Sequence, residues 1–136
     1  PVGVVAPASR RPATRAARYG QTRAFFFDDW AYPERDGFWT RADGEATVVL
    51  DSGAAQPSGL PMSVTAGQEP TTVWLSTGDW QESVALRAGE RRDVMLPPAS
   101  GDVWTLRVRS GTGFRPSERE PGNRDVRELA AWIAVR

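Results

Sequence analysis

Short runs of hydrophobic residues alternate with turn residues along most of this chain, a pattern typical of antiparallel β structure. The runs are roughly four to eight residues long, and Gly, Pro and Asp gather between them. The segments predicted as strands are Arg23–Phe27, Gly37–Arg41, Glu45–Asp51, Leu60–Thr65, Thr71–Thr77, Gln81–Arg87, Asp93–Leu96, Asp102–Ser110 and Leu129–Val135. We therefore expect an all-β fold, an antiparallel β-sandwich of jelly-roll-like type with about eight or nine strands.

The segment Asp102–Ser110 shows the alternation most clearly. Trp104, Leu106 and Val108 fall on one face, whereas the other face is polar and includes Arg109. Because successive side chains of a strand point to opposite faces of a sheet, this segment is expected to have one face in the core and one in water. Trp104 is accordingly expected in the core.

The last segment, residues 124–135, fits two periods. Its apolar residues have helical spacing when counted from Val126 and strand spacing over Leu129–Val135. A helix beginning at Asp125 is the alternative, because Asp is a good N-cap. We expect a final strand, since a strand beside Asp102–Ser110 would close the sandwich.

Residues 1–20 are rich in Ala, Pro and Arg and show no sustained period. They are predicted to form an irregular basic arm or linker, with one short helical turn near Ala13–Arg18, and residues 21–136 to form the β-sandwich domain. The first residue is Pro1, so the chain is expected to be a fragment or a processed product. No apolar run approaches the ~20 residues of a transmembrane helix, so no membrane span is expected in this chain.

Charge is balanced, with 17 basic and 17 acidic residues. A nucleic-acid-binding surface needs an excess of positive charge, so no nucleic-acid partner is expected. The loop Phe114–Glu128 alternates Arg with Asp and Glu. This pattern favours a lattice of solvated ion pairs over an anion site, and each such pair contributes only about 0–1 kcal/mol.

The residue types that are missing exclude several kinds of catalysis. The chain contains no His, no Cys and no Lys. Without them it has no imidazole base for a Ser or Cys nucleophile, no usual zinc ligands, and no Lys for Schiff-base or P-loop chemistry. A carboxylate pair for glycoside hydrolysis and an oxygen-ligand metal site are still possible. We expect no enzyme; a small carboxylate-based hydrolase would need two acids facing each other across one cleft.

Four carboxylates gather within nine residues, at Asp28, Asp29, Glu34 and Asp36. Calcium takes six to eight oxygen ligands from carboxylates and carbonyls, so Asp28, Asp29 and Asp36 are candidate Ca²⁺ ligands. The alternative is an acidic loop that water solvates.

Six tryptophans are present, and several do not fit the inward pattern of their segments. Trp74 and Trp132 are out of phase with their apolar neighbours, while other aromatic residues lie in or beside predicted loops. Exposed aromatic rings stack on the apolar face of sugars. The candidate ligand-binding residues are Trp30, Tyr32, Trp39 and Trp80. The alternative is that neighbouring loops or another domain bury Trp74 and Trp132.

Three motifs resemble a known family: residues 27–41 (FDDWAYPERDGFWTR), residues 113–117 (GFRPS) and residues 123–129 (NRDVREL). They are similar to the C-terminal extracytoplasmic β-sandwich domains, which resemble carbohydrate-binding modules, of bacterial membrane glycosyltransferases and related uncharacterised proteins. That family commonly has Gly after the final Leu, where this chain has Ala130. The resemblance implies a jelly-roll-like accessory module outside the cytoplasm, supports a strand for Leu129–Val135, and supplies no catalytic residues.

Two functional hypotheses follow. The first is a non-catalytic carbohydrate-binding or substrate-presenting accessory module of a larger cell-envelope protein, with a glycan as partner. The second is a structural or protein-docking module without glycan affinity, whose exposed Trp side chains pack against the parent polypeptide or a membrane protein.

Overall fold

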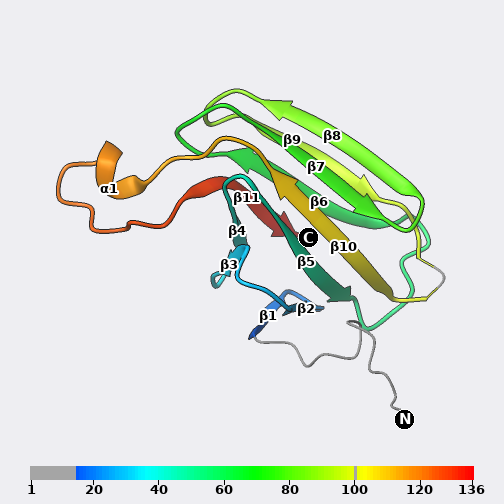
Figure 1. Cartoon of the computed structure of the whole chain (residues 1–136). Coiled ribbons are helices and arrows are strands. Elements are labelled where there is room, and N and C mark those ends of the chain that lie inside the picture. Colours follow the sequence, from blue (N-terminus) through cyan, green and yellow to red (C-terminus); the bar gives the residue numbers. More distant parts are fainter. Residues whose placement is uncertain (1–14, 100) are drawn as a thin grey trace, which may run out of the picture.

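A computed structural model describes residues 15–99 and 101–136, which form two antiparallel sheets packed face to face (Figure 1). The first sheet has six strands in the order β1 (Arg15–Tyr19), β2 (Thr22–Phe26), β5 (Gly44–Asp51), β10 (Val103–Ser110), β7 (Thr71–Thr77) and β8 (Trp80–Leu86). The second has five, in the order β3 (Ala31–Pro33), β4 (Phe38–Arg41), β11 (Leu129–Val135), β6 (Leu60–Ala66) and β9 (Arg91–Leu96). The predicted all-β antiparallel sandwich is confirmed.

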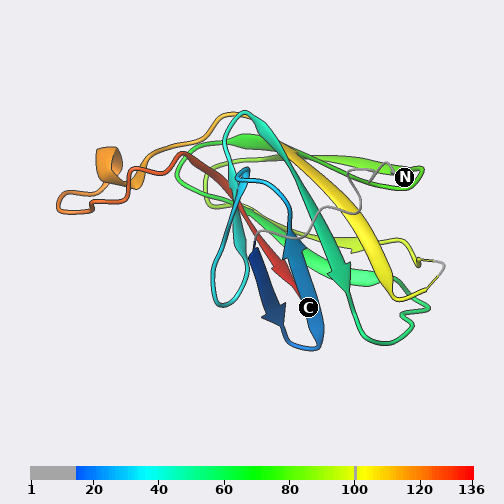
Figure 2. The same ribbon diagram turned by 60° about the horizontal axis from the view of Figure 1, so that its bottom comes forward.

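The described residues contain two strands beyond the nine predicted, β1 and β3. Strand β1 corrects the expectation of an irregular arm up to residue 20 and of a helical turn reaching Arg18. It pairs with β2 through a tight turn in which Gly20 has a φ of 64°, and the two lie side by side in Figure 2. The buried Tyr19 donates a hydrogen bond from its hydroxyl to the Gly37 carbonyl oxygen at 2.8 Å. Residues 1–14, which include most of the predicted arm, lie outside the described residues.

Strand β3 lies inside a segment that was expected to be entirely loop. It is three residues long, ends at Pro33 and pairs with β4 at the edge of the five-stranded sheet. Pro is tolerated in an edge strand, because such a strand has a neighbour on one side only and the N–H that Pro lacks can be one that would point to solvent. The sequence pattern is too short to predict such a strand.

The C-terminal segment forms a strand, β11, and the helical alternative is wrong. Its partners are β4 and β6, so β11 lies in the sheet opposite β10. The expectation that it would lie beside β10 is therefore wrong. The register shifts between Leu129 and Trp132, which is a β-bulge. The bulge turns the Ala131 N–H toward Thr40, whose Oγ1 accepts its hydrogen bond at 3.0 Å.

The core lies between the two sheets and takes alternate residues from each strand. Trp104 is only 2% exposed, as expected from its phase, and its indole N–H donates to the Pro97 carbonyl oxygen at 2.7 Å. Phe26 and Phe38 meet edge to face across the layers, with ring centroids 5.2 Å apart. The side chains at the other alternate positions of each strand point away from the core and form the outer faces of the two sheets.

A long loop, residues 111–128, projects from one end of the sandwich and carries the short helix α1 (Pro116–Arg119) (Figures 1 and 2). The loop is anchored where Phe114 and Leu129 exchange two backbone hydrogen bonds of 2.7 and 2.8 Å. Phe114 also packs on Gly67, where a Cβ atom would clash with the ring. The loop is therefore attached to the outer side of the five-stranded sheet.

Candidate functional site

The outer face of the six-stranded sheet carries polar residues around one tryptophan. The pairing registers of β5, β10, β7 and β8 align side chains in two rows across these strands. The first row is Glu45, Arg109, Trp74 and Ser83, and the second is Thr47, Arg107, Ser76 and Gln81. All eight side chains point away from the core. Most of them alternate with buried residues along their own strand, and the others are cross-strand partners of residues that do so.

Trp74 is the large aromatic side chain at the centre of this face. Its neighbours Val73 and Leu75 are buried, so Trp74 points outward and is 38% exposed. The guanidinium of Arg109, from the adjacent strand β10, lies over the indole with its central carbon 4.2 Å from the ring centroid. This cation–π contact holds the ring on one side and fixes its orientation.

Two hollows adjoin Trp74, and the indole lines both. The first, here called the strand hollow, has a volume of about 510 Å³ and is lined by Glu45, Trp74, Leu75, Ser76, Gln81, Glu82, Ser83 and Arg109. The second, here called the loop hollow, has a volume of about 570 Å³ and is lined by Pro70, Thr71, Thr72, Trp74, Ala85, Leu86, Arg87, Glu90, Arg92, Gly111 and Thr112. Both fall in the range of about 300–1,000 Å³ that is typical of small-molecule sites.

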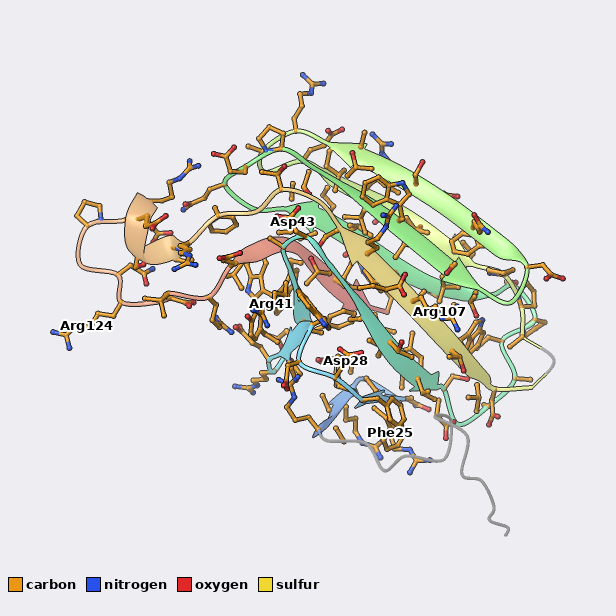
Figure 3. The ribbon with its side chains drawn as sticks, viewed as in Figure 1. Phe25, Asp28, Arg41, Asp43, Arg107 and Arg124 are labelled. Carbon is orange, nitrogen blue, oxygen red and sulfur yellow. The ribbon has the colours of Figure 1, made fainter. Side chains whose placement is uncertain are left out.

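The hydrogen-bonding side chains around the strand hollow are not used by the fold. Within the described part of the chain, Glu45, Gln81 and Glu82 make no side-chain hydrogen bond or ion pair, and Arg109 contacts only Trp74. Arg107, which projects from β10 in the second row (Figure 3), is also without a partner there. Donors and acceptors are therefore available beside a stacking surface, as sugar hydroxyls require.

Two acidic residues, Glu45 and Glu82, line the strand hollow. They belong to β5 and β8, which are three strand steps apart, so at about 4.8 Å per step their backbones are roughly 14 Å apart. The two side chains therefore reach the strand hollow from its opposite sides, across β10 and β7.

The ligand-binding residues predicted from the sequence lie elsewhere. Trp30 is 37% exposed, but it packs over Gly44, where a Cβ would clash with the indole, and Arg41 lies 4.5 Å from its ring centroid. Tyr32 is half-buried beneath Arg127, at 5.1 Å. Neither ring lines the strand hollow or the loop hollow.

Trp39 and Trp80 are half-buried in packing contacts. Trp39 pairs with Trp132 across β4 and β11 and meets both Trp132 and Phe114 edge to face, with centroids 5.4 and 6.0 Å apart. Trp80 packs against the core at the opposite end of the molecule, beside Pro98. Of the four predicted aromatic residues, the structure brings together Tyr32 and Trp39, which are cross-strand partners on β3 and β4, whereas Trp30 packs over Gly44 and Trp80 lies beside Pro98.

The three predicted calcium ligands are separated as well. Asp28 accepts backbone hydrogen bonds from Trp30 and Thr47, both at 3.0 Å, and lies beside β5 (Figure 3). Asp29 forms an exposed ion pair with Arg15 at 3.8 Å, while the exposed Asp36 lies in the connection between β3 and β4. Among residues 15–99 and 101–136, no group of three or more acidic side chains is placed to hold a metal ion.

The projecting loop, by contrast, is rich in internal ion pairs. Arg127 contacts Asp125 at 2.7 Å and Glu34 at 3.0 Å, and Arg115 pairs with Glu128. Hydrogen bonds from Arg127 hold the pKa of Asp125 below its usual value, and the hydrogen bond from Arg115 does the same for the pKa of Glu128. These charges satisfy one another, as the alternating signs predicted.

No helix within the described ranges is long and apolar enough to cross a membrane. No family model matches the chain, and no curated protein matches it.

Several solved structures are similar in outline. The cupin domain of CENP-C from Drosophila melanogaster is 7% identical with a TM-score of 0.29, and the match covers 90% of this chain and 74% of that one. The carbohydrate-binding module TmCBM61, solved in complex with beta-1,4-galactotriose, is 10% identical with a TM-score of 0.31, covering 93% and 91%. Fe(II) HppE is 12% identical with a TM-score of 0.29, covering 97% and 58%. At these values the matches carry no argument about function.

Proposed function

We propose that this domain is a non-catalytic carbohydrate-binding module whose ligand lies on the outer face of the six-stranded sheet. The observation that carries the proposal is Trp74, an oriented and exposed indole between two hollows. A pyranose presents an apolar C–H face and a rim of hydroxyls, so it needs an aromatic surface together with hydrogen-bonding groups. Arg109, Glu45 and Gln81 supply those groups without breaking any contact of the fold.

We further propose that the module acts outside the cytoplasm as an accessory part of a larger cell-envelope protein. The motifs in residues 27–41 and 113–129 support this, since they resemble extracytoplasmic domains of membrane glycosyltransferases. In such a protein the module would hold an acceptor or product glycan near a catalytic domain in another part of the polypeptide.

Affinity gel electrophoresis tests the proposal directly. The domain is run through gels that contain β-1,4-galactan, arabinan, mannan or hydroxyethyl cellulose, and at least one is expected to retard it. Trp74→Ala should lose the retardation. Trp30→Ala is the matched control, because Trp30 is equally exposed and also stacked against an Arg, but lies outside both hollows.

Two results would contradict the proposal. One is unchanged migration in all four polysaccharides, which would favour the protein-docking alternative. The other is retardation that survives Trp74→Ala and disappears in Trp30→Ala, which would return the site to the loop predicted from the sequence.

A further inference from the structure

The two hollows lie one after the other along β7, on opposite sides of the same indole. Thr72 lines the loop hollow, Ser76 lines the strand hollow, and Trp74 between them lines both. On the neighbouring strand β8, Ala85 and Ser83 repeat this order, since they pair with Thr72 and Trp74. From Pro70 to Ser76 the surface extends for roughly 20 Å at about 3.3 Å per residue. A ligand occupying both hollows would therefore run parallel to β7 and pass over Trp74.

The two faces of the indole differ. Arg109 lies over the Trp74 indole and lines the strand hollow but not the loop hollow. From this we assign its guanidinium to the strand-hollow side of the ring, which leaves the other side toward the loop hollow. Stacking on Trp74 is thus available in the loop hollow, whereas Arg109 can donate hydrogen bonds into the strand hollow.

The linings differ in the same sense. Pro70, Ala85, Leu86 and Gly111 give the loop hollow an apolar lining, and its Glu90 is already bonded by Arg92 at 3.3 Å and by the Arg87 N–H at 2.8 Å. The strand hollow is lined mainly by Ser, Gln, Glu and Arg side chains. One hollow therefore favours an apolar sugar face and the other favours sugar hydroxyls.

Charge indicates which sugars fit. The two hollows together contain three Arg (Arg87, Arg92, Arg109) and three Glu (Glu45, Glu82, Glu90). The positive and negative charges are equal in number, so the surface offers no net positive charge to a carboxylated or sulfated sugar. An anionic sugar would lose hydration there without compensation, whereas an uncharged sugar has no charge to desolvate.

We infer that the ligand is a chain of at least two linked, uncharged sugars that runs along β7, with one sugar stacked on Trp74 in the loop hollow and the next hydrogen-bonded in the strand hollow. This inference rests on the proposed function and adds the ligand class and its direction on the sheet. Arg109 is both a positioning residue for the indole and a donor in the second subsite.

Calorimetric titration with an oligosaccharide ladder tests the inference. Oligosaccharides of one to six units are prepared from the polysaccharide that retards the domain most. Affinity is expected to rise at least about tenfold between one unit and two, because the second hollow is then filled. Binding should persist against neutral oligosaccharides and fall when the same units carry carboxylates.

Blocking variants separate the two subsites. Ala85→Tyr fills the loop hollow and Ser76→Tyr fills the strand hollow; both positions lie on strand faces, where aromatic residues are favoured, so the fold should persist. Each variant is expected to weaken binding of the longest oligosaccharide about tenfold. Thr105→Tyr is the matched control, because Thr105 is exposed on β10 and lines neither hollow. If Ala85→Tyr or Ser76→Tyr lowers the thermal midpoint strongly, the corresponding Gln variant, Ala85→Gln or Ser76→Gln, is used in its place.

The inference is wrong if one unit binds as tightly as six, or if one of the two blocking variants binds like Thr105→Tyr. Those outcomes would leave binding at Trp74 intact and reduce the site to a single sugar. Failure of the proposed function is different, since the wild-type domain would then bind none of the oligosaccharides.

Discussion

The two outer sheet faces of this protein both present tryptophan at outward positions, yet they use it differently. On the five-stranded sheet, Trp39 and Trp132 pack edge to face with each other, and Phe114 holds the base of the projecting loop against them. On the six-stranded sheet, Trp74 has no aromatic neighbour within contact in the described ranges and stands between two hollows.

Polar residues show the same division. On the loop side, Arg127, Asp125 and Glu34 are joined in ion pairs. Beside Trp74, Glu45 and Gln81 have no such partner among the described residues. A surface whose groups satisfy one another is organised for stability, while a surface with unused donors, acceptors and an exposed ring can bind a ligand. This difference supports the proposal that one outer face serves stability and the other serves binding.

The largest expected effect comes from exchanging Trp39 and Trp74 for Ala in parallel. Trp39→Ala removes two aromatic contacts and should lower the free energy of unfolding by about 2–3 kcal/mol, with polysaccharide binding retained. Trp74→Ala should cost at most about 1 kcal/mol of stability and abolish binding. Urea denaturation and affinity electrophoresis measure the two effects. Equal losses of stability in both variants would remove the distinction between the faces.

A smaller effect is expected at Asp28, which the sequence placed in a calcium site. Asp28→Ala removes the acceptor for the Thr47 and Trp30 N–H groups and should cost about 1–2 kcal/mol of stability. Neither calcium nor a chelator should shift the thermal midpoint of the wild-type domain. A thermal midpoint that rises with calcium in the wild type, but not in Asp28→Ala, would show that Asp28 belongs to a calcium site after all.

The smallest effect is expected from acid, and it should be local. The folded pKa values of Asp125 and Glu128 lie below their usual values of 3.8 and 4.5, so their pairing stabilises the loop above those values and is lost as the pH falls through the lowered ones. Hydrogen exchange, corrected for the intrinsic rate at each pH, should speed up in residues 115–128 below about pH 4 while β7 stays protected. Simultaneous loss of protection in β7 would show that the loop and the binding face open together.

The strand pattern was predictable because it depends on local alternation. The period of two in β10 placed Trp104 inside and Arg109 outside, and Leu129–Val135 formed a strand as expected. The missed strands lack that signal: β3 has three residues, and β1 gains its place by pairing with β2 and burying Tyr19. Both pair with the next strand along the chain, but their own residues are too few or too polar to show the period of two that marks a strand.

The candidate site was predictable only in part. The alternation along β7 indicated that Trp74 points away from the core, because its neighbours Val73 and Leu75 point inward. The same alternation holds for Trp132, which is nevertheless half-buried against Trp39, so alternation alone does not identify the exposed ring. The predicted aromatic residues were chosen for their proximity to loops. Trp30 illustrates the limit, because its ring packs on the backbone of Gly44 and no local pattern of the sequence links these two positions.

By itself the sequence determined that most of the chain forms strands, which residues of Asp102–Ser110 face the core, and that His-, Cys- and Lys-dependent chemistry is absent. Each of these follows from residue type or from the period of two, and both are local. The tertiary structure decided that β11 joins the sheet opposite β10, and that Trp39 is covered while Trp74 stays open. The physical reason is that exposure depends on which strands and loops become neighbours, and that is fixed only when the two sheets pack.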